Sequence, residues 1–192
     1  MDVSAAGKKE APDLDDYRSL VAGVFDDASR NSNVVREFEN FGAGHARIVL
    51  EVMVQHAASS VCIYSHCFAR EIYSARWFDS FLARVPQGQI TLLVESKSVF
   101  DDERSILSTA KHLAHDSRVS IRYVPETGRA QHVALIDGKF ARVERSKPET
   151  VERSTNPDFK ASVALGTSSQ LVSEALRLFN LVLARSIPLS VR

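Results

Sequence analysis

Between residues 13 and 30, apolar side chains recur at the spacing of one face of an α-helix. The positions are Leu14, Tyr17, Val21, Val24, Phe25 and Ala28. Acidic residues crowd the start of the stretch, where the helix dipole favours negative charge. This pattern predicts an amphipathic helix. Residues 1–12 are small, charged and aperiodic, which predicts a disordered tail.

The chain beyond residue 44 alternates between helical and strand-like patterns. Helices are predicted at 45–59, 74–85 and 101–116, and strands at 60–65, 89–96 and 118–125. The strand at 89–96 has a nearly continuous apolar centre, which is typical of a strand covered on both faces. Turn formers in the intervening stretch 31–44 predict a break between the first two helices.

A hairpin is predicted in the second half of the chain. Strands at 131–136 and 139–143 flank Asp137-Gly138, a pair that favours hairpin turns. A last strand is expected at 159–167 and a long helix at 168–186. Strands that alternate with helices predict an α/β fold, with a mostly parallel mixed sheet covered by helices on both faces.

Composition adds a few limits. Lys and Arg together number 24, as do Asp and Glu, so a formal net charge of zero gives no support for a strongly basic nucleic-acid- or membrane-binding protein. The first residues lack the apolar stretch of a secretory signal, and no apolar run is long enough to span a bilayer. Cys62 and Cys67 do not suggest a disulfide framework. We therefore expect a cytoplasmic protein.

Candidate chemistry gathers where predicted strands end. Ser65 and His66 follow one strand, Glu95 follows another, and Thr167 follows the last, while His132 lies within the hairpin. In open α/β sheets, sites form at the carboxyl ends of strands. We therefore expect a polar site at this edge.

The run from about residue 45 to 186 resembles one half of the phospholipase D-like superfamily. The resemblance lies in the strands "SVCIYS" and "QITLLVES", then "AQHVALIDGKFARVE", a strand and a closing helix. The family carries H-x-K-x4-D-G, followed by Gly-Ser and an Asn. The resemblance implies a covalent phosphohistidine, a lysine that binds the phosphate, and a site built from two copies. It divides the chain into a tail (1–12), an N-terminal helical extension (13–43) and the phospholipase D-like domain (44–192).

The family motif is degenerate in this sequence. When Asp137-Gly138 is the anchor, the family lysine position falls on His132, the histidine position falls on Ala130, and no glycine stands at the Gly-Ser position. When His132 is instead taken as the family histidine, Ala134 stands at the lysine position and Asp137 comes two residues early. Phosphohistidine chemistry needs a nucleophilic imidazole and a cation, and each register loses at least one of them.

The resemblance implies a catalytically degenerate, dimeric module for interaction, scaffolding or ligand binding. The alternatives are a phosphodiesterase or nuclease with a rearranged site, and a nucleic-acid-binding accessory protein. The candidate catalytic residues are His132, Asp137 and His66, and the candidate phosphate- or ligand-binding residues are Lys139, Lys160, Ser65 and Thr167. No cofactor and no membrane partner are expected.

Other groups have simpler interpretations. Cys62, His66 and Cys67 lack the further ligands of a zinc site, and His112 with His115 fits a solvated helix surface. A solvated loop is also favoured for one basic cluster, with a phosphate- or nucleic-acid-facing patch as the alternative; its members are Arg142, Arg145, Lys147, Arg153 and Lys160. The helix at 13–30 either caps the core or binds a second copy or another protein.

Overall fold

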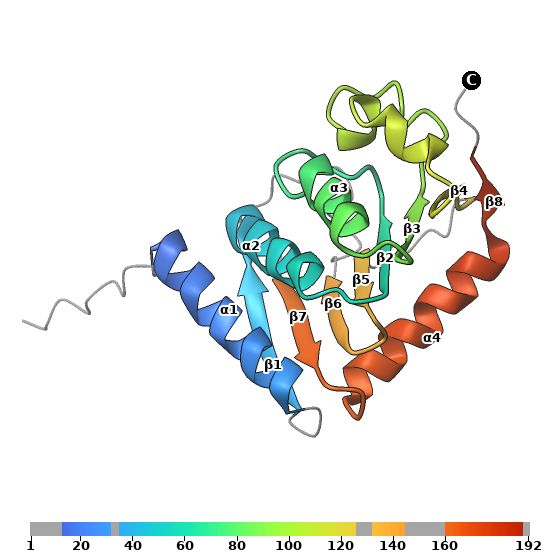
Figure 1. The fold of residues 1–192 in the computed structure, drawn as a ribbon. Helices are drawn as coiled ribbons and strands as arrows, with labels where there is room; N and C mark the ends of the chain where they lie inside the picture. The colour runs from blue at the N-terminus through green and yellow to red at the C-terminus, as the bar shows by residue number, and fades with distance from the viewer. Residues whose placement is uncertain (1–12, 32–34, 126–131, 145–159, 190–192) are drawn as a thin grey trace, which may run out of the picture.

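The computed structural model describes residues 13–31, 35–125, 132–144 and 160–189 (Figure 1). Its helices are α1 (Leu14–Arg30), α2 (Gly42–Gln55), α3 (Ala75–Arg84) and α4 (Gln170–Arg185), with short 3-10 helices η1 (Ile106–Ser108) and η2 (Lys111–His115). Its strands are β1 (Arg36–Phe41), β2 (Ser60–Ser65), β3 (Gln89–Val94), β4 (Val119–Tyr123), β5 (His132–Ile136), β6 (Phe140–Glu144), β7 (Lys160–Leu165) and β8 (Ile187–Pro188). The predicted tail 1–12 lies outside the described residues.

The strands form one mixed sheet in the order β1-β7-β6-β5-β2-β3-β4-β8. Strands β2, β3 and β4 pair in parallel, and the other five neighbouring pairs within the described residues are antiparallel. The expected α/β class with a mixed sheet is confirmed. Its antiparallel share is larger than we predicted, because the hairpin continues into β7 and β1 instead of returning to parallel pairing.

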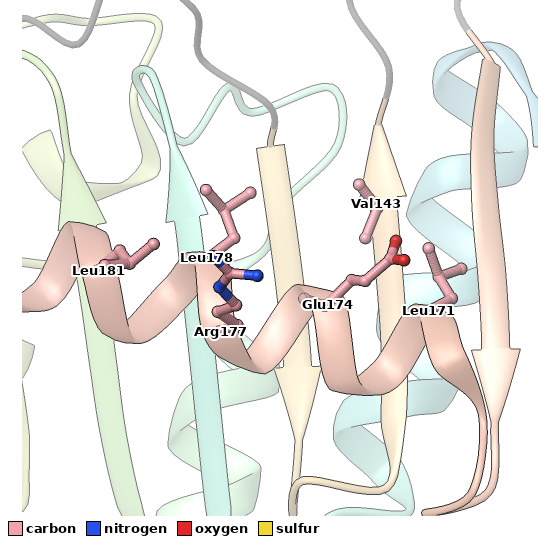
Figure 2. A pocket seen from close by; sticks show the side chains of 7 residues that line it. Val143, Leu171, Glu174, Arg177, Leu178 and Leu181 are labelled. Carbon is pink, nitrogen blue, oxygen red and sulfur yellow. The ribbon is translucent and has the colours of Figure 1, made fainter.

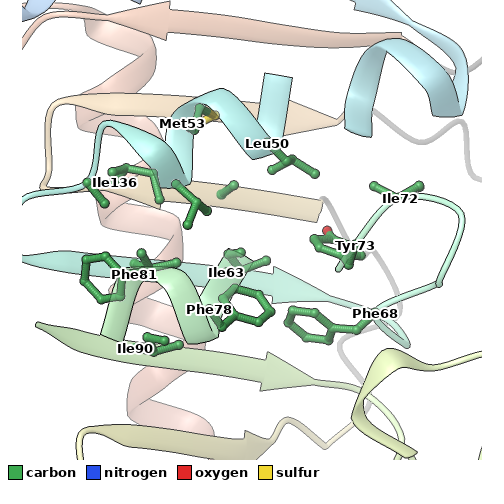
Figure 3. Packing of buried hydrophobic residues seen from close by; sticks show 14 of the residues in the cluster. Leu50, Met53, Ile63, Phe68, Ile72, Tyr73, Phe78, Phe81, Ile90 and Ile136 are labelled. Atoms are coloured by element: carbon green, nitrogen blue, oxygen red, sulfur yellow. The ribbon is translucent and has the colours of Figure 1, made fainter. Parts of the chain in front are cut away.

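Helices cover both faces of the sheet, as predicted. The first core cluster packs α1, α2 and α3 on one face, and includes Leu50, Ile63 and Phe78 (Figure 3). The second packs α4 on the other face, where Phe179 and Val182 meet Leu93 and Leu135. Strand alternation therefore sends odd- and even-numbered side chains of each strand into different cores.

The predicted amphipathic helix is α1. The Asp13 side chain caps it by accepting a hydrogen bond from the Asp15 N–H. Its buried face consists of Tyr17, Val21, Phe25 and Ala28. The Phe25 ring contacts the Phe140 ring edge-on at 5.1 Å between centroids. This face thus packs on the core formed by the sheet and α2, which is the capping role considered for it.

The β5–β6 hairpin forms as predicted. Asp137 and Gly138 both have positive φ, at 53° and 64°, in the left-handed region that primed hairpin turns require. Their register pairs His132 with Glu144 and Ala134 with Arg142. The turn chemistry therefore decides which residues lie beside His132.

Two predictions of secondary structure were wrong. The stretch 31–44 was expected to be a break, but Arg36–Phe41 forms β1 at the edge of the sheet, paired with β7. The helix expected at 101–116 is replaced by η1 and η2. The hydroxyls of Ser108 and Thr109 donate to nearby carbonyl oxygens, of Ser105 and Ile106, so they offer the backbone local hydrogen bonds that compete with a continuous α-helix.

Among the described residues, no helix combines the length and apolarity needed to cross a membrane.

Candidate functional site at the carboxyl edge of β2

Five polar residues meet at one edge of the sheet, where β2, β3 and β6 end and β5 begins; we call this the site edge. They are Ser65, His66, Glu95, His132 and Glu144. Pairing of β2 with β3 in parallel, and with β5 antiparallel, brings them together. The predicted placement of Ser65, His66, Glu95 and His132 is therefore found, whereas Glu144 was not among the candidates.

His132 is held from both sides of its ring. Its Nδ1 lies 3.5 Å from a carboxylate oxygen of Glu144, and its Nε2 accepts a hydrogen bond from the backbone N–H of His66 at 3.4 Å. Because Nε2 accepts this bond, Nδ1 is the ring nitrogen that can donate to Glu144. The lone pair on Nε2, which a nucleophile would use, therefore points at a backbone donor.

Glu144 joins His132 to a buried arginine. Its carboxylate lies 3.3 Å from Nη1 of Arg142, whose side chain is only 2% exposed. Burial alone would raise the pKa of Glu144, but His132 and Arg142 outweigh it, so the pKa is lowered. Arg142 was expected in a solvated basic loop. That expectation was wrong, because strand alternation turns its side chain into the core beneath α1 and α2.

A second cluster lies on the other face of the same edge. Nδ1 of His66 contacts a carboxylate oxygen of Glu95 at 2.8 Å, and the Tyr64 hydroxyl donates to the other oxygen. The hydrogen bond to Glu95 raises the pKa of His66. Burial opposes ionisation of Glu95, yet bonds from His66 and Tyr64 lower its pKa. The His66 ring is half exposed, so this carboxylate–histidine pair can exchange protons with a ligand.

The two clusters lie on opposite faces of the sheet. Tyr64 belongs to the core beneath α4, whereas Ser65, the next residue, points to the side of α2 and α3. Ser65 is 2% exposed and hydrogen-bonds to Tyr73, whose pKa burial raises to about 12. Ser65 is thus buried beside Tyr73. The two clusters are linked by the backbone N–H of His66 and by the electrostatic interaction of His132 with Glu95.

Lys160 shares the edge but stands apart from His132. It begins β7, two strands away from β5, and its ammonium group lies 5.1 Å from the centre of the Phe41 ring. The rest of the expected basic cluster, Arg145, Lys147 and Arg153, lies outside the described residues, as does Ala130.

Asp137, Lys139 and Thr167 are placed at the opposite edge. Asp137 and Lys139 belong to the β5–β6 turn, and Thr167 follows β7, which runs opposite to β2. The carboxyl ends of two strands lie at the same edge of a sheet only when the strands run in the same direction. These three predicted residues therefore do not join His132. The carboxylate of Asp137 instead accepts hydrogen bonds from the backbone of Ala58, Ser59 and Ser60.

The thiols are poorly suited to ligate metal. Burial raises the pKa of Cys62 to about 11 and also raises the pKa of Cys67. Within the described part of the chain, no three His, Cys, Asp or Glu side chains are grouped to hold a metal ion. His112 of η2 forms a hydrogen bond of 2.8 Å with Asp79 of α3.

A separate hollow of about 300 Å³ lies beside α4, and none of the predicted site residues lines it (Figure 2). Figure 2 shows Leu171, Glu174, Leu178 and Leu181 projecting from α4, with Val143 of β6 at the back. It is mainly apolar and is distinct from the site edge.

Sequence reasoning missed Glu144, Tyr64 and Tyr73 as partners in the site. The signal for Glu144 was present, since a hairpin that turns at Asp137-Gly138 must bring the end of its second strand beside His132. Tyr73 lies in the loop before α3, and only the folded chain brings it to Ser65.

Comparisons with known proteins point to a fold and not to a close relative. No protein-family model and no curated protein sequence matches the chain. NucT from Helicobacter pylori is 16% identical, with a TM-score of 0.59 over 81% of this chain and 99% of its own. Nuc from Salmonella typhimurium, a phospholipase D family member, is 12% identical, with a TM-score of 0.57 over 82% of this chain and 99% of its own.

TrmBL2, an archaeal chromatin protein with a novel mode of DNA binding, is 9% identical, with a TM-score of 0.61 over 91% of this chain. The chain spans 62% of the length of TrmBL2, so the match covers only part of that protein. The element order, the mixed sheet and these neighbours agree with one another, and the chain has the phospholipase D-like fold.

Proposed function

We propose that the protein is a catalytically degenerate phospholipase D-like module that acts as a dimer in interaction, scaffolding or ligand binding. The carrying observation is the state of His132, whose ring lies between the Glu144 carboxylate and the His66 backbone N–H. An imidazole held in this way offers no free lone pair for attack on phosphorus.

The charges around His132 support the same proposal. Phosphoryl transfer needs cations or hydrogen-bond donors where negative charge develops. Here the described neighbour of His132 is a carboxylate, and Arg142 is buried and directed at that carboxylate. Among the described residues, the side chain that lies against His132 is therefore anionic, which favours neutral or cationic ligand groups at the site edge.

Hydrolysis assays test the proposal. We expect no turnover of bis(p-nitrophenyl) phosphate or of single- and double-stranded DNA above the background of His66→Ala and His132→Ala variants. The matched control is His112→Ala, which removes a histidine on η2 that pairs with Asp79 and does not belong to the site edge. Activity that His132→Ala abolishes and His112→Ala retains would overturn the proposal.

A second candidate function is a phosphodiesterase with a rearranged site, and the His66–Glu95 pair favours it. A carboxylate on Nδ1 orients an imidazole and stabilises its protonated form, as in many acid–base dyads. This candidate predicts hydrolysis that declines as pH rises through the raised pKa of His66, if His66 acts as the acid. A shift of that decline to lower pH in Glu95→Gln, with retained folding, would support it.

The dimer has its own test. Nuc and NucT match over nearly their whole length, so this chain corresponds to one compact unit of that fold. Light scattering after gel filtration should give twice the mass of the chain. A monomer at micromolar concentration would remove the dimer from the proposal and leave the site-edge argument intact.

Nucleic-acid binding is the remaining alternative, and the likeness to the DNA-binding TrmBL2 is its support. Filter retention of DNA or RNA at about 0.15 M salt, with a steep loss at higher salt, would favour it. The exposed basic residue to replace first is Lys160, at the start of β7.

A further inference from the structure

A groove rich in arginine lies on the outer side of the helical layer, away from the sheet. It has a volume of about 700 Å³ and is lined by α1, α2 and α3, which lie side by side in Figure 1. Its polar lining includes Arg18, Arg47, Arg76 and Arg84, together with Glu51 and Trp77. We call it the arginine groove; none of its residues belongs to the site edge.

The groove concentrates positive charge, although the net charge of the chain is zero. Four guanidinium groups face one carboxylate, that of Glu51, which already pairs with Arg18 at 2.9 Å. The full sequence has 24 basic and 24 acidic residues, so the local excess is a property of this surface and not of the composition. Such a surface attracts anions, and guanidinium groups suit phosphate oxygens in particular.

Two of the arginines are fixed in place by backbone carbonyls. Arg84 donates to the carbonyl oxygens of Val54 and Ala57 at 3.0 and 2.8 Å. Arg47 donates from Nη1 to the Arg70 carbonyl at 3.3 Å, and its guanidinium lies 5.8 Å from the centre of the Trp77 ring. The groove therefore contains an ordered cation–aromatic pair on which another planar group can stack.

Arg76 is placed where it disfavours the helix. It lies in the first turn of α3, where the helix dipole is positive, and no acidic residue stands in that turn. The Ser74 side chain makes no capping hydrogen bond there, and Arg76 is exposed. A bound anion at this position would offset both features, which gives a physical reason for an arginine that local stability opposes.

From these features we infer that the arginine groove binds a nucleotide unit, either free or within a single strand. The phosphate would be held by Arg76 with the other guanidinium groups, and the base would stack at the Arg47–Trp77 pair. A volume of about 700 Å³ suits such a ligand, since small-molecule sites are on the order of 300–1,000 Å³. This inference does not depend on the function proposed for the site edge.

The chain supplies its own reporter, because Trp77 is its single tryptophan. We expect saturable quenching of tryptophan fluorescence on titration with ADP and with oligothymidylate, and little effect of adenosine, which lacks phosphate. Inorganic phosphate should compete at high concentration. Stronger binding of ADP would identify a free nucleotide, and stronger binding of oligothymidylate would identify a single strand; both outcomes support the inference.

Four variants separate this site from general electrostatics. Arg76→Gln should weaken binding about tenfold, as the loss of a charged hydrogen bond predicts. Glu51→Gln should strengthen it, since it removes the opposing carboxylate. Arg177→Gln, an exposed arginine on α4 on the other side of the sheet, should leave it unchanged. Trp77→Phe, followed with a labelled oligonucleotide, should weaken binding while circular dichroism confirms folding.

Two results would overturn the inference. One is the absence of saturable quenching by any of the nucleotide probes. The other is an equal loss of binding in Arg76→Gln and Arg177→Gln, which would indicate only a diffuse charge effect. The site edge is tested by hydrolysis and the groove by nucleotide affinity, so failure at the groove and failure at the site edge remain distinguishable.

Discussion

Asp137, which the family resemblance aligns with a motif aspartate, is bound by backbone groups at the start of β2. Its carboxylate accepts four hydrogen bonds of 2.7–2.8 Å, from the backbone N–H groups of Ala58, Ser59 and Ser60 and from the Ser59 hydroxyl. Burial alone would raise the pKa of Asp137, but these bonds outweigh it and the pKa is lowered. The residue therefore joins the β5–β6 turn to the start of β2.

Replacing Asp137 should destabilise the protein without touching the site edge. We expect Asp137→Ala to lower the free energy of unfolding by about 3 kcal/mol, because it leaves backbone donors at the start of β2 without their charged acceptor. Urea unfolding followed by circular dichroism measures the loss. Asp101→Ala, at an exposed aspartate, is the control and should change stability by less than about 0.5 kcal/mol. Equal effects of the two substitutions would contradict the assigned role.

At the scale of elements, the patterns that depend on local spacing were predicted well. The apolar face of α1 and the turn at Asp137-Gly138 depend on neighbours within a few residues, and both formed as expected. Strand β1 escaped notice because it is a polar edge strand whose pairing partner, β7, lies far along the chain. The stretch replaced by η1 and η2 failed because serine and threonine hydroxyls bond locally. The spacing of apolar residues reveals neither long-range strand pairing nor local side-chain hydrogen bonds.

The same limit explains the candidate site. His132, His66 and Ser65 were found because strand ends are visible in sequence, and Thr167 was misplaced because strand direction is not. Only the pairing order of the whole sheet reveals that β7 runs opposite to β2. The pairing of Glu144 with Arg142 could be predicted only by knowing to which face of the sheet these side chains of β6 point.

The role of α1 can be decided by comparing its two faces. Phe25 is fully buried against Phe140, whereas Leu20 on the same helix is 65% exposed. If α1 caps the core, Phe25→Ala should cost about 3–5 kcal/mol in unfolding free energy, and Leu20→Ala should cost little. Thermal and urea unfolding of the two variants test this. A small effect of Phe25→Ala would mean that α1 is only loosely attached and free to bind a partner.

At the scale of the whole molecule, ionised carboxylates support the fold at many separate points. Besides Asp137 and Glu144, the pKa is lowered for Glu95, Asp102 and Asp116, where it reaches about 2 for Asp116 beside Arg118. His66 is shifted in the opposite sense, since its pKa is raised by Glu95. The loss of stability at acidic pH and the loss at basic pH are therefore expected to come from different residues.

The pH dependence of stability follows from these directions. A carboxyl whose pKa is lower in the folded state stabilises above its unfolded value, near 4, and that contribution is lost as pH falls through the folded pKa. His66, with a raised pKa, stabilises below its ordinary value of 6.5, and its contribution is lost as pH rises through the folded pKa. We therefore expect the urea midpoint to be greatest between about pH 5 and 6.5.

Two variants test which residue causes the loss of stability on each side of the pH optimum. His66→Gln can still donate a hydrogen bond to Glu95 but does not titrate, so the decline above about pH 6.5 should become shallower while the acid limb stays. Asp137→Asn should lower the midpoint at neutral pH and flatten the acid limb, because an amide has no carboxylate to protonate. A wild-type midpoint that climbs from pH 6.5 to 8, or an alkaline limb that His66→Gln leaves unchanged, would show that the His66–Glu95 pair does not form in solution.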